Sequence, residues 1–319
     1  MRRSGLLAAL AAVSLAAVLL VTALPGCGGS SGGSERLTLA LDFQPNAAHA
    51  GVYTAVREHL DRRHGIALRI RAPSASTDSL KLLATGRADV SIVDIHDLWL
   101  ARERGEDVVG IGAIVERPLA AVIARPGVRR PRNLEGKRVG VTGLPSDDAV
   151  LRAVVEHDGG RFDRVKRETI GFSAVPSLIT GKVQGVTAFW NAEGVALRHR
   201  GVRTNEFRVD DYGAPRYPEL VIATKASTLR DSPDVIDEAL AKLHRGTAVA
   251  LRDRAATIDR IAKASGADQG LVRAQLDAVA PALLPPVVLD RDALERWADF
   301  DARFAILKRR PDVDAAFPR

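Results

Sequence analysis

Cysteine is almost absent from this 319-residue chain, which contains only Cys27. A single cysteine excludes a disulfide bond within one chain and a metal site built on cysteine ligands. The common catalytic signatures are missing as well: there is no Gly-x-Ser-x-Gly elbow between a predicted strand and helix, no His-Glu-x-x-His helix and no Walker loop. We therefore expect neither an enzyme nor a resident metal or cofactor.

Charge of one sign is not concentrated anywhere along the chain. The formal net charge is +7, or +5 without Arg2 and Arg3, and acids and bases alternate in stretches such as "REHLDRRHG" and "LRDRAATIDR". No basic block or ladder of aromatic residues is present to bind phosphates and stack on bases. This pattern argues against nucleic acid as a partner, and we expect an evenly solvated monomer.

The N-terminal region predicts export. Two arginines precede a nearly uninterrupted apolar stretch of 19 residues, Leu6 to Leu24, as in a signal peptide. A permanent anchor helix is the alternative, because a stretch of this length can span a bilayer. The next residues, Leu24-Pro25-Gly26-Cys27, resemble the lipobox of bacterial lipoproteins. We therefore expect a signal peptide over 1–26, a lipid on Cys27 and a flexible Gly/Ser tether over 27–36. The protein would then be anchored to the outer face of the cell membrane, or lie in the periplasm.

From residue 37 the chain alternates short β-rich runs with amphipathic helical patterns, which is typical of α/β architecture. The predicted strands are 37–41, 67–71, 89–93, 108–115, 119–124, 137–141, 165–170, 185–189, 206–210 and 219–223. The predicted helices are 49–63, 77–85, 95–104, 147–157, 174–180 and 191–199. From Ser232 onward the pattern is nearly all helical, with breaks at Gly266 and around Pro281, Pro285 and Pro286.

An internal similarity indicates two lobes. "LLATGRADVSIV" (82–93) and "SLITGKVQGVTAF" (177–189) each run from a helix end through glycine and a basic residue into a buried strand. We expect lobe 1 to comprise 37–117 and 216–319, and lobe 2 to comprise 118–215. Two hinge strands would join the lobes, the second carrying Gly213, Pro215 and Pro218, whose dihedral angles suit a hinge.

An exported, lipid-tethered, two-lobed α/β chain resembles the substrate-binding protein of an ABC importer, with the type 2 periplasmic-binding-protein fold. The segments "DFQPNAAHAGVYTA", "GKRVGVTGLPSDDAVLRAVVEHDGG", "FWNAEGVALRHRG" and "DYGAPRYPEL" narrow this resemblance. Together they are similar to the branch that binds pyrimidine precursors of thiamine and is related to the yeast-type thiamine pyrimidine synthases. The resemblance implies a small heterocyclic ligand, with formylaminopyrimidine or hydroxymethylpyrimidine first. It also implies ABC permease and ATPase subunits as partners.

Other functions remain open at this stage. Riboflavin suits the same kind of site, and other importers of this fold take aliphatic sulfonates. A sensing domain that acts without a permease is a third possibility. A pyrimidine-synthase-like enzyme fits less well, because the resemblance implies a cofactor lysine and a cysteine-rich iron motif. The chain has one cysteine and no lysine before Lys81.

The first predicted strand ends in an unusual group of side chains: Asp42, Phe43, Asn46, His49 and Tyr53. In open α/β sheets, ligands bind beyond the carboxyl ends of the strands. The resemblance therefore implies that Phe43 or Tyr53 stacks on a flat ring while Asp42 and Asn46 bond its nitrogens. The alternatives are structural: an Asp or Asn cap for the following helix, and core positions for the histidine and tyrosine.

A second candidate group follows the predicted strand 185–189. Trp190 would stack on the ligand and the Glu193 carboxylate would accept from an exocyclic amine, with Asn191 either beside them or acting as a helix cap. Asp94, after the third strand, and Tyr212, in the second crossing between the lobes (209–223), complete the candidate site. His96 is a weaker candidate, since Asp94 or Asp97 can simply cap the next helix.

The helix starts favour a neutral or weakly cationic ligand. Helix N-termini attract anions, but "STDS" (76–79) and "SDDA" (146–149) each place acid in the first turn. Those carboxylates would repel a sulfonate or phosphate.

Overall fold

The structure is a computed structural model, and it describes residues 35–57, 66–304 and 307–319. The predicted signal peptide, Cys27 and nearly all of the tether lie outside these residues. In the part of the chain that is described, none of the helices combines the length and the apolar character needed to cross a bilayer.

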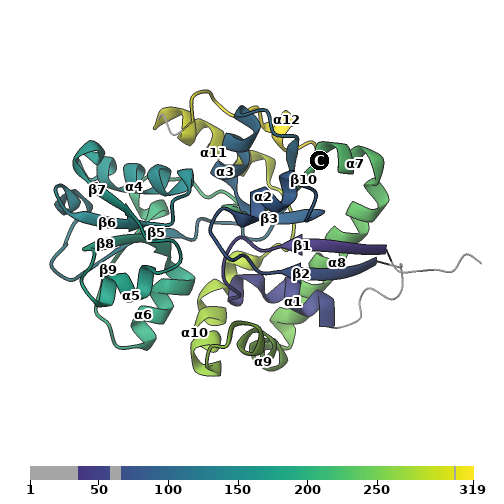
Figure 1. The fold of residues 1–319 in the computed structure, drawn as a ribbon, viewed down its shortest axis with the longest axis horizontal. Coiled ribbons are helices and arrows are strands. Elements are labelled where there is room, and N and C mark those ends of the chain that lie inside the picture. Colours follow the sequence, from purple (N-terminus) through teal and green to yellow (C-terminus); the bar gives the residue numbers. More distant parts are fainter. Residues whose placement is uncertain (1–34, 58–65, 305–306) are drawn as a thin grey trace, which may run out of the picture. The chain divides into compact units, whose positions relative to one another are not determined.

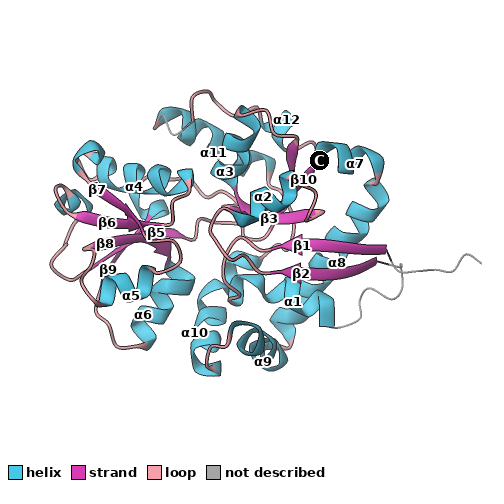
Figure 2. Cartoon of the chain, viewed as in Figure 1, coloured by secondary structure: helices cyan, strands magenta, loops and turns pink. Residues whose placement is uncertain are grey.

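The first of two five-stranded sheets has the order β2-β1-β3-β10-β4 (Figures 1 and 2). Strands β1, β2 and β3 are parallel, whereas β10 runs antiparallel to both β3 and β4. The chain therefore leaves this sheet after β4 and returns to it with β10. The strands are β1 (Glu35–Ala40), β2 (Ile66–Arg71), β3 (Val90–Asp94), β4 (Val108–Ala113) and β10 (Leu220–Lys225).

The second sheet has the order β7-β6-β8-β5-β9, with β6 parallel to β7 and β8 and with β5 antiparallel to β8 and β9. Its strands are β5 (Ala120–Ala124), β6 (Arg138–Val141), β7 (Lys166–Thr169), β8 (Gly185–Phe189) and β9 (Asn205–Arg208). All ten predicted strands are present, each within about two residues of its predicted bounds, and the two-lobed α/β fold is confirmed. The lobe boundaries at 117/118 and 215/216 stay a prediction.

Helices cover both sheets in the predicted order. Those of the α/β part are α1 (Ala50–Arg57), α2 (Asp78–Ala84), α3 (Ile95–Glu103), α4 (Pro145–His157), α5 (Ala174–Ile179) and α6 (Val195–His199). The C-terminal helices are α7 (Ala226–Asp231), α8 (Pro233–Arg252), α9 (Arg254–Ser265), α10 (Gln269–Val279), α11 (Arg291–Arg303) and α12 (Val313–Ala316). Gly266 ends α9 in the left-handed conformation, as the sequence predicts.

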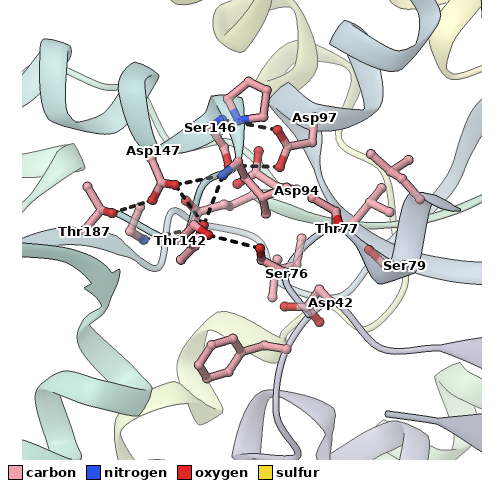
Figure 3. A pocket seen from close by; sticks show the side chains of 18 of the residues that line it. Asp42, Ser76, Thr77, Ser79, Asp94, Asp97, Thr142, Ser146, Asp147 and Thr187 are labelled. Atoms are coloured by element: carbon pink, nitrogen blue, oxygen red, sulfur yellow. Dashed lines mark hydrogen bonds between the residues drawn. The ribbon is translucent and has the colours of Figure 1, made fainter. Parts of the chain in front are cut away.

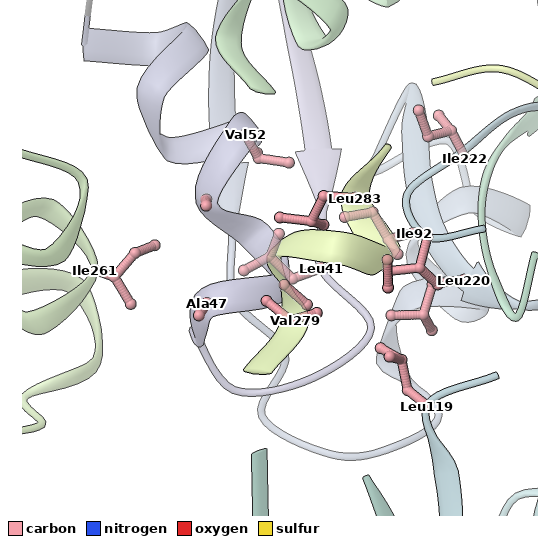
Figure 4. Close-up of a cluster of buried hydrophobic side chains, with 14 of the residues drawn as sticks. Leu41, Ala47, Val52, Ile92, Leu119, Leu220, Ile222, Ile261, Val279 and Leu283 are labelled. Atoms are coloured by element: carbon pink, nitrogen blue, oxygen red, sulfur yellow. The ribbon is translucent and has the colours of Figure 1, made fainter. Parts of the chain in front are cut away.

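Burial explains why these segments are strands. Every residue of β4 and β5 is buried, as expected for apolar runs that are covered on both faces. Figure 4 shows part of the core, where Leu41, Ile92 and Leu220 come together with Leu283 beneath the strand ends. This packing fixes the loop after β1, which carries the first group of candidate residues.

The start of α1 is held by a close helix crossing. A Cβ atom on Gly51 would lie 2.0 Å from the Thr247 hydroxyl of α8, and one on Gly246 would lie 2.3 Å from the Gly51 carbonyl. Neither glycine can carry a side chain without moving α8 away from α1.

Candidate ligand-binding site

A cavity of about 450 Å³ is lined by residues from both sheets and their loops (Figure 3). This volume lies within the range usual for small-molecule sites. Its lining is rich in carboxyl groups, which come from Asp42, Asp94, Asp97, Glu106, Asp147, Glu193 and Glu219. Two basic residues, Lys81 and Arg104, also line it, and Arg104 pairs with Glu106 at 3.0 Å. Such a lining disfavours anions and suits a ligand that donates hydrogen bonds.

Asp42 is oriented by a buried histidine. The Asn46 backbone N–H donates to His49 Nδ1 at 3.3 Å, so the ring proton lies on Nε2, which contacts Asp42 Oδ1 at 2.9 Å. His49 is fully buried and does not line the cavity. It acts on the site through Asp42, whose other oxygen makes no hydrogen bond to the described residues.

Asn46 caps the short helix η1 (Ala47–His49). Its side-chain oxygen accepts from the Ala48 N–H at 2.8 Å, and its amide donates to the Gln44 carbonyl at 3.0 Å. Asn46 therefore has the capping role that the sequence left open, and it does not line the cavity.

Three phenylalanines form an aromatic wall of the cavity. Phe43, from the loop after β1, meets Phe172 edge-on with ring centroids 4.8 Å apart, and its centroid lies 6.1 Å from that of Phe189. All three rings line the cavity. A flat ring bound here would meet ring faces and edges, as aromatic pairs prefer.

Glu193 faces the same cavity from the π-helical turn η4 (Trp190–Gly194) at the end of β8. Its Oε2 accepts from the Phe189 backbone N–H at 3.1 Å. Burial raises the pKa of Glu193 to about 7, with a smaller contribution from the negative charge of Asp42. Asp42 and Glu193, from different sheets, are thus close enough to interact across the cavity.

Asp94 lies at the end of β3 and forms a triad with two buried residues, His96 and Asp301. It accepts from the His96 backbone N–H at 2.8 Å and contacts His96 Nδ1 at 2.9 Å, while His96 Nε2 lies 3.1 Å from Asp301. Burial alone would lower the pKa of His96, but the charges of Asp301 and Asp94 outweigh it and raise that pKa well above its usual value. Asp94 lines the cavity as predicted, whereas His96 does not.

Two sets of hydrogen bonds join the halves of the cavity (Figure 3). Asp97 of α3 accepts from the Ser146 hydroxyl at 2.9 Å and from its backbone N–H at 3.2 Å, at the start of α4. The Ser76 hydroxyl donates to the Thr142 carbonyl at 3.1 Å. These contacts join the first turn of α3 and the segment before α2 to the start of α4 and the loop before it. The sequence indicated capping acids at the starts of α2 and α4 but not a contact between the halves.

Trp190 does not line the cavity, although it was expected to stack on the ligand. Its indole Nε1–H donates to the Pro118 carbonyl at 3.0 Å, and the Arg208 guanidinium lies 4.3 Å from the ring centroid. Arg117 lies 5.6 Å from the same ring. The side chain therefore packs against the first crossing between the sheets, the segment 114–119 that connects β4 with β5.

Three other predicted residues also lie off the cavity. Asn191 is fully buried in η4, Tyr53 packs half-buried against the core from α1, and Tyr212 packs edge-on against His157 and Phe207. Of the ten predicted ligand contacts, the lining thus contains four: Asp42, Phe43, Asp94 and Glu193. Their expected contacts with a ligand stay a prediction.

The carboxyl groups of the cavity make stability depend on pH. Burial raises the pKa of Asp97 and Glu219 to about 8 and that of Glu193 to about 7, against about 4 in an unfolded chain. The folded state then holds more protons than the unfolded state between about pH 5 and pH 8. The free energy of unfolding should therefore fall as the pH rises through this window. His96, whose folded pKa is also raised, acts in the same direction above about pH 6.5.

Thermal unfolding at about pH 5 and about pH 8 measures this effect, and we expect the higher melting temperature at the lower pH. Asp97→Asn, which has no proton to lose, should reduce the difference. A melting temperature that rises toward pH 8 would contradict the assignment. Carboxyls with lowered pKa, such as Asp158, are ionised in both states across this window and do not contribute.

The two sheets, the returning strand β10 and the cavity between their strand ends define the periplasmic-binding-protein fold. The alkanesulfonate-binding protein SsuA of Xanthomonas axonopodis pv. citri, solved bound to MOPS, matches with a TM-score of 0.73 at 18% identity, over 88% of this chain and 97% of that protein. The Candida albicans CA3427 gene product matches with a TM-score of 0.69 at 15% identity, over 88% and 95%. These likenesses show the fold alone.

The chain belongs to the NMT1/THI5-like family, whose profile matches residues 46–256. The formylaminopyrimidine-binding protein of Halalkalibacterium halodurans is 30% identical over 205 residues, which are 63% of this chain and 62% of that protein. The 4-amino-5-hydroxymethyl-2-methylpyrimidine phosphate synthase of Schizosaccharomyces pombe is 20% identical over 236 residues, 69% and 67%. This chain therefore matches a little under two thirds of the named binding protein. The relatives include both a binding protein and a synthase.

Proposed function

We propose that this protein is the extracytoplasmic substrate-binding component of an ABC importer and captures a thiamine pyrimidine precursor. The observation that carries the proposal is the pairing of Asp42 and Glu193 from different sheets beside the Phe43, Phe172 and Phe189 wall. An aminopyrimidine has a flat ring for the wall and an exocyclic amine whose N–H groups need acceptors. A permease and an ATPase would be its partners.

The excess of acidic over basic residues in the lining supports a pyrimidine over a sulfonate. Seven carboxyl-bearing residues line the cavity against two basic ones, and one of those, Arg104, is already paired. An anion placed among these carboxyls would raise their pKa values further and lose free energy. The acids at the helix starts are also engaged: Asp78 accepts from Ser74 and Ala75, and Asp147 from Gly143 and Leu144.

The lining also supports binding over catalysis. It contains no histidine and no cysteine, and its single lysine, Lys81, is an exposed residue of α2. Among the described residues no group of three or more His, Cys, Asp or Glu side chains is arranged to hold a metal ion. We therefore propose a binding protein, despite the named synthase among its relatives.

Mass spectrometry of the molecule released from purified protein tests the ligand directly. We expect an aminopyrimidine, either formylaminopyrimidine or hydroxymethylpyrimidine, and saturable binding of the same compound in calorimetry. Release of a flavin or an alkyl sulfonate, together with no binding of either pyrimidine, would overturn the proposal.

We also propose that Cys27 carries a lipid that anchors the protein to the outer face of the membrane. Its support is the sequence: the cysteine directly follows the apolar run and precedes the Gly/Ser tether. Metabolic labelling with a fatty acid should mark the wild type but not Cys27→Ser. Equal labelling of the two proteins would contradict the anchor.

A further inference from the structure

Glu219 contacts both crossings between the sheets, 114–119 and 209–219, and the cavity. It immediately precedes β10, where the chain returns to the first sheet, and its backbone carbonyl accepts from the Ile95 N–H at 2.9 Å. Its side chain is fully buried and lines the cavity. No feature of the local sequence "YPEL" distinguishes this glutamate from an ordinary surface acid.

One carboxyl oxygen of Glu219 is hydrogen-bonded to the backbone at the end of the first crossing. Oε2 accepts hydrogen bonds from two successive backbone amides, those of Leu119 and, at 2.8 Å, Ala120, where the chain enters β5. These partners are separated from Glu219 by 100 and 99 residues. The Leu119 carbonyl in turn accepts from the Trp190 N–H at 3.0 Å. A single side chain thus fixes the entry to the second sheet relative to the exit toward the first.

The second oxygen of Glu219 has no hydrogen-bond partner among the described residues, although it is buried. A buried polar atom without a partner is destabilising, so such an atom commonly marks a place for a ligand or water. Ala120 and Asp94, beside Glu219, line the same cavity. Glu219 therefore belongs to the lining of the cavity, and the partner that its second oxygen lacks can come from a bound molecule.

We propose that Glu219 is a positioning residue that couples ligand binding in the cavity to the two crossings. Its Oε2 accepts hydrogen bonds from the Leu119 and Ala120 amides, a pair of bonds called the clasp below, and its Oε1 bonds to the ligand. This inference rests on the proposed ligand-binding function of the cavity. A ligand contact at Oε1 would hold the carboxyl in place and so strengthen the clasp, which favours the liganded arrangement of the crossings.

The protonation state of Glu219 indicates whether its free oxygen donates or accepts a hydrogen bond. Burial, followed by the charge of Asp94, raises its pKa to about 8, although the Leu119 amide and the positive charge of His96 act in the opposite direction. At neutral pH the carboxyl is then mostly protonated. Because Oε2 already accepts two N–H groups, the proton lies on Oε1, which donates to an acceptor such as a ring nitrogen or a carbonyl oxygen of the ligand.

Amide hydrogen exchange and calorimetry on the full folded chain test this coupling, with hydroxymethylpyrimidine as the probe. In Glu219→Met, which has similar length and no acceptor, exchange of the Leu119 and Ala120 amides should become at least tenfold faster while Val122, farther along β5, is unchanged. The affinity for the probe should fall at least tenfold. Glu219→Gln keeps an acceptor oxygen and presents an N–H donor, so both quantities should stay within about threefold of wild type.

Glu116 supplies the matched control. It lies at the first crossing and its pKa is raised to about 7 by burial and by Asp290, but it does not line the cavity. Glu116→Met should change neither the exchange of the two amides nor the affinity.

Three results would overturn the inference: unchanged exchange in Glu219→Met, faster exchange with unchanged affinity, or failure of Glu219→Gln to restore both. If Glu219→Met does not fold, Glu219→Gln still tests the inference. Faster exchange of the two amides or loss of binding in Glu219→Gln would contradict the assigned roles. If the wild type binds no pyrimidine, the proposed function fails by itself, and the clasp still stands or falls on the exchange of the two amides.

Discussion

Replacing Glu193 with glutamine is expected to weaken the binding of an aminopyrimidine by about tenfold to a hundredfold. The wild-type carboxylate has two acceptor oxygens, of which Oε2 is bonded to the Phe189 N–H and the other is available to the ligand amine. A glutamine has one acceptor and one donor group. Whichever way it turns, either the Phe189 N–H or the ligand amine faces another donor and loses its hydrogen bond inside a buried site.

The pH dependence of binding distinguishes this role from simple packing. The pKa of Glu193 is about 7, so the carboxylate that accepts from the amine forms as the pH rises through that value. The contribution of Glu193 to affinity should increase between about pH 6 and pH 8, and this contribution should be absent from Glu193→Gln. Asp97 and Glu219, with pKa values of about 8, remain in both proteins, so the difference between the two profiles isolates Glu193.

Glu156→Gln is the matched control for this experiment, because Glu156 is exposed on α4 and lies outside the cavity. It should bind like the wild type at every pH. Calorimetry with hydroxymethylpyrimidine measures all three proteins. Wild-type affinity in a Glu193→Gln protein that melts normally would show that the amine finds its acceptor elsewhere, with Asp42 as the remaining candidate across the cavity.

The strands could be predicted because each one corresponds to a short local pattern in the sequence. A run such as "AAVIA" is apolar at every position, and this matches a strand covered on both faces. Asp42, Phe43 and Asp94 could be predicted for a related reason: they directly follow such runs, and strand ends meet at one edge of a parallel sheet. For these residues, the position directly after a predicted strand was sufficient to place them at the cavity.

The contacts that complete the cavity depend on long-range geometry. Asp97 meets Ser146 across 49 residues, and Glu219 meets Leu119 across 100. Nothing in "HDLW" or "YPEL" indicates which distant backbone these carboxyls will approach. Phe172 was missed for the same reason, since it stands in a turn after β7 and reaches the cavity only because the two sheets face each other through their loops.

Trp190 illustrates a different limit of the sequence. We expected a strand that ends at residue 189 and a helix over 191–199, with Trp190 and Glu193 both facing the ligand. The chain instead forms the π-helical turn η4, which begins at Trp190 and includes Glu193. Glu193 consequently lines the cavity while the indole turns toward Pro118 and the first crossing.

Trp190→Ala is therefore expected to reduce stability far more than it reduces affinity. The indole is 4% exposed, its N–H is bonded to Pro118, and the Arg208 guanidinium lies against its ring. Removing a buried tryptophan side chain costs about 3–5 kcal/mol, because transfer free energy is lost and a cavity remains. For a chain of this size the melting temperature should fall by about 5–8 °C.

Trp190→Phe separates the parts of this effect, since it keeps a ring for Arg208 and loses only the hydrogen bond and part of the volume. It should melt between the wild type and Trp190→Ala, with the lost hydrogen bond worth about 1 kcal/mol. Both variants should bind hydroxymethylpyrimidine within about tenfold of wild type when affinity is measured well below their melting temperatures. A Trp190→Ala protein that melts like the wild type but binds at least a hundredfold more weakly would show that the indole contacts the ligand. The stacking surface would then have to extend beyond the three phenylalanines, because the ring now seen against the first crossing would have to turn into the cavity when ligand binds.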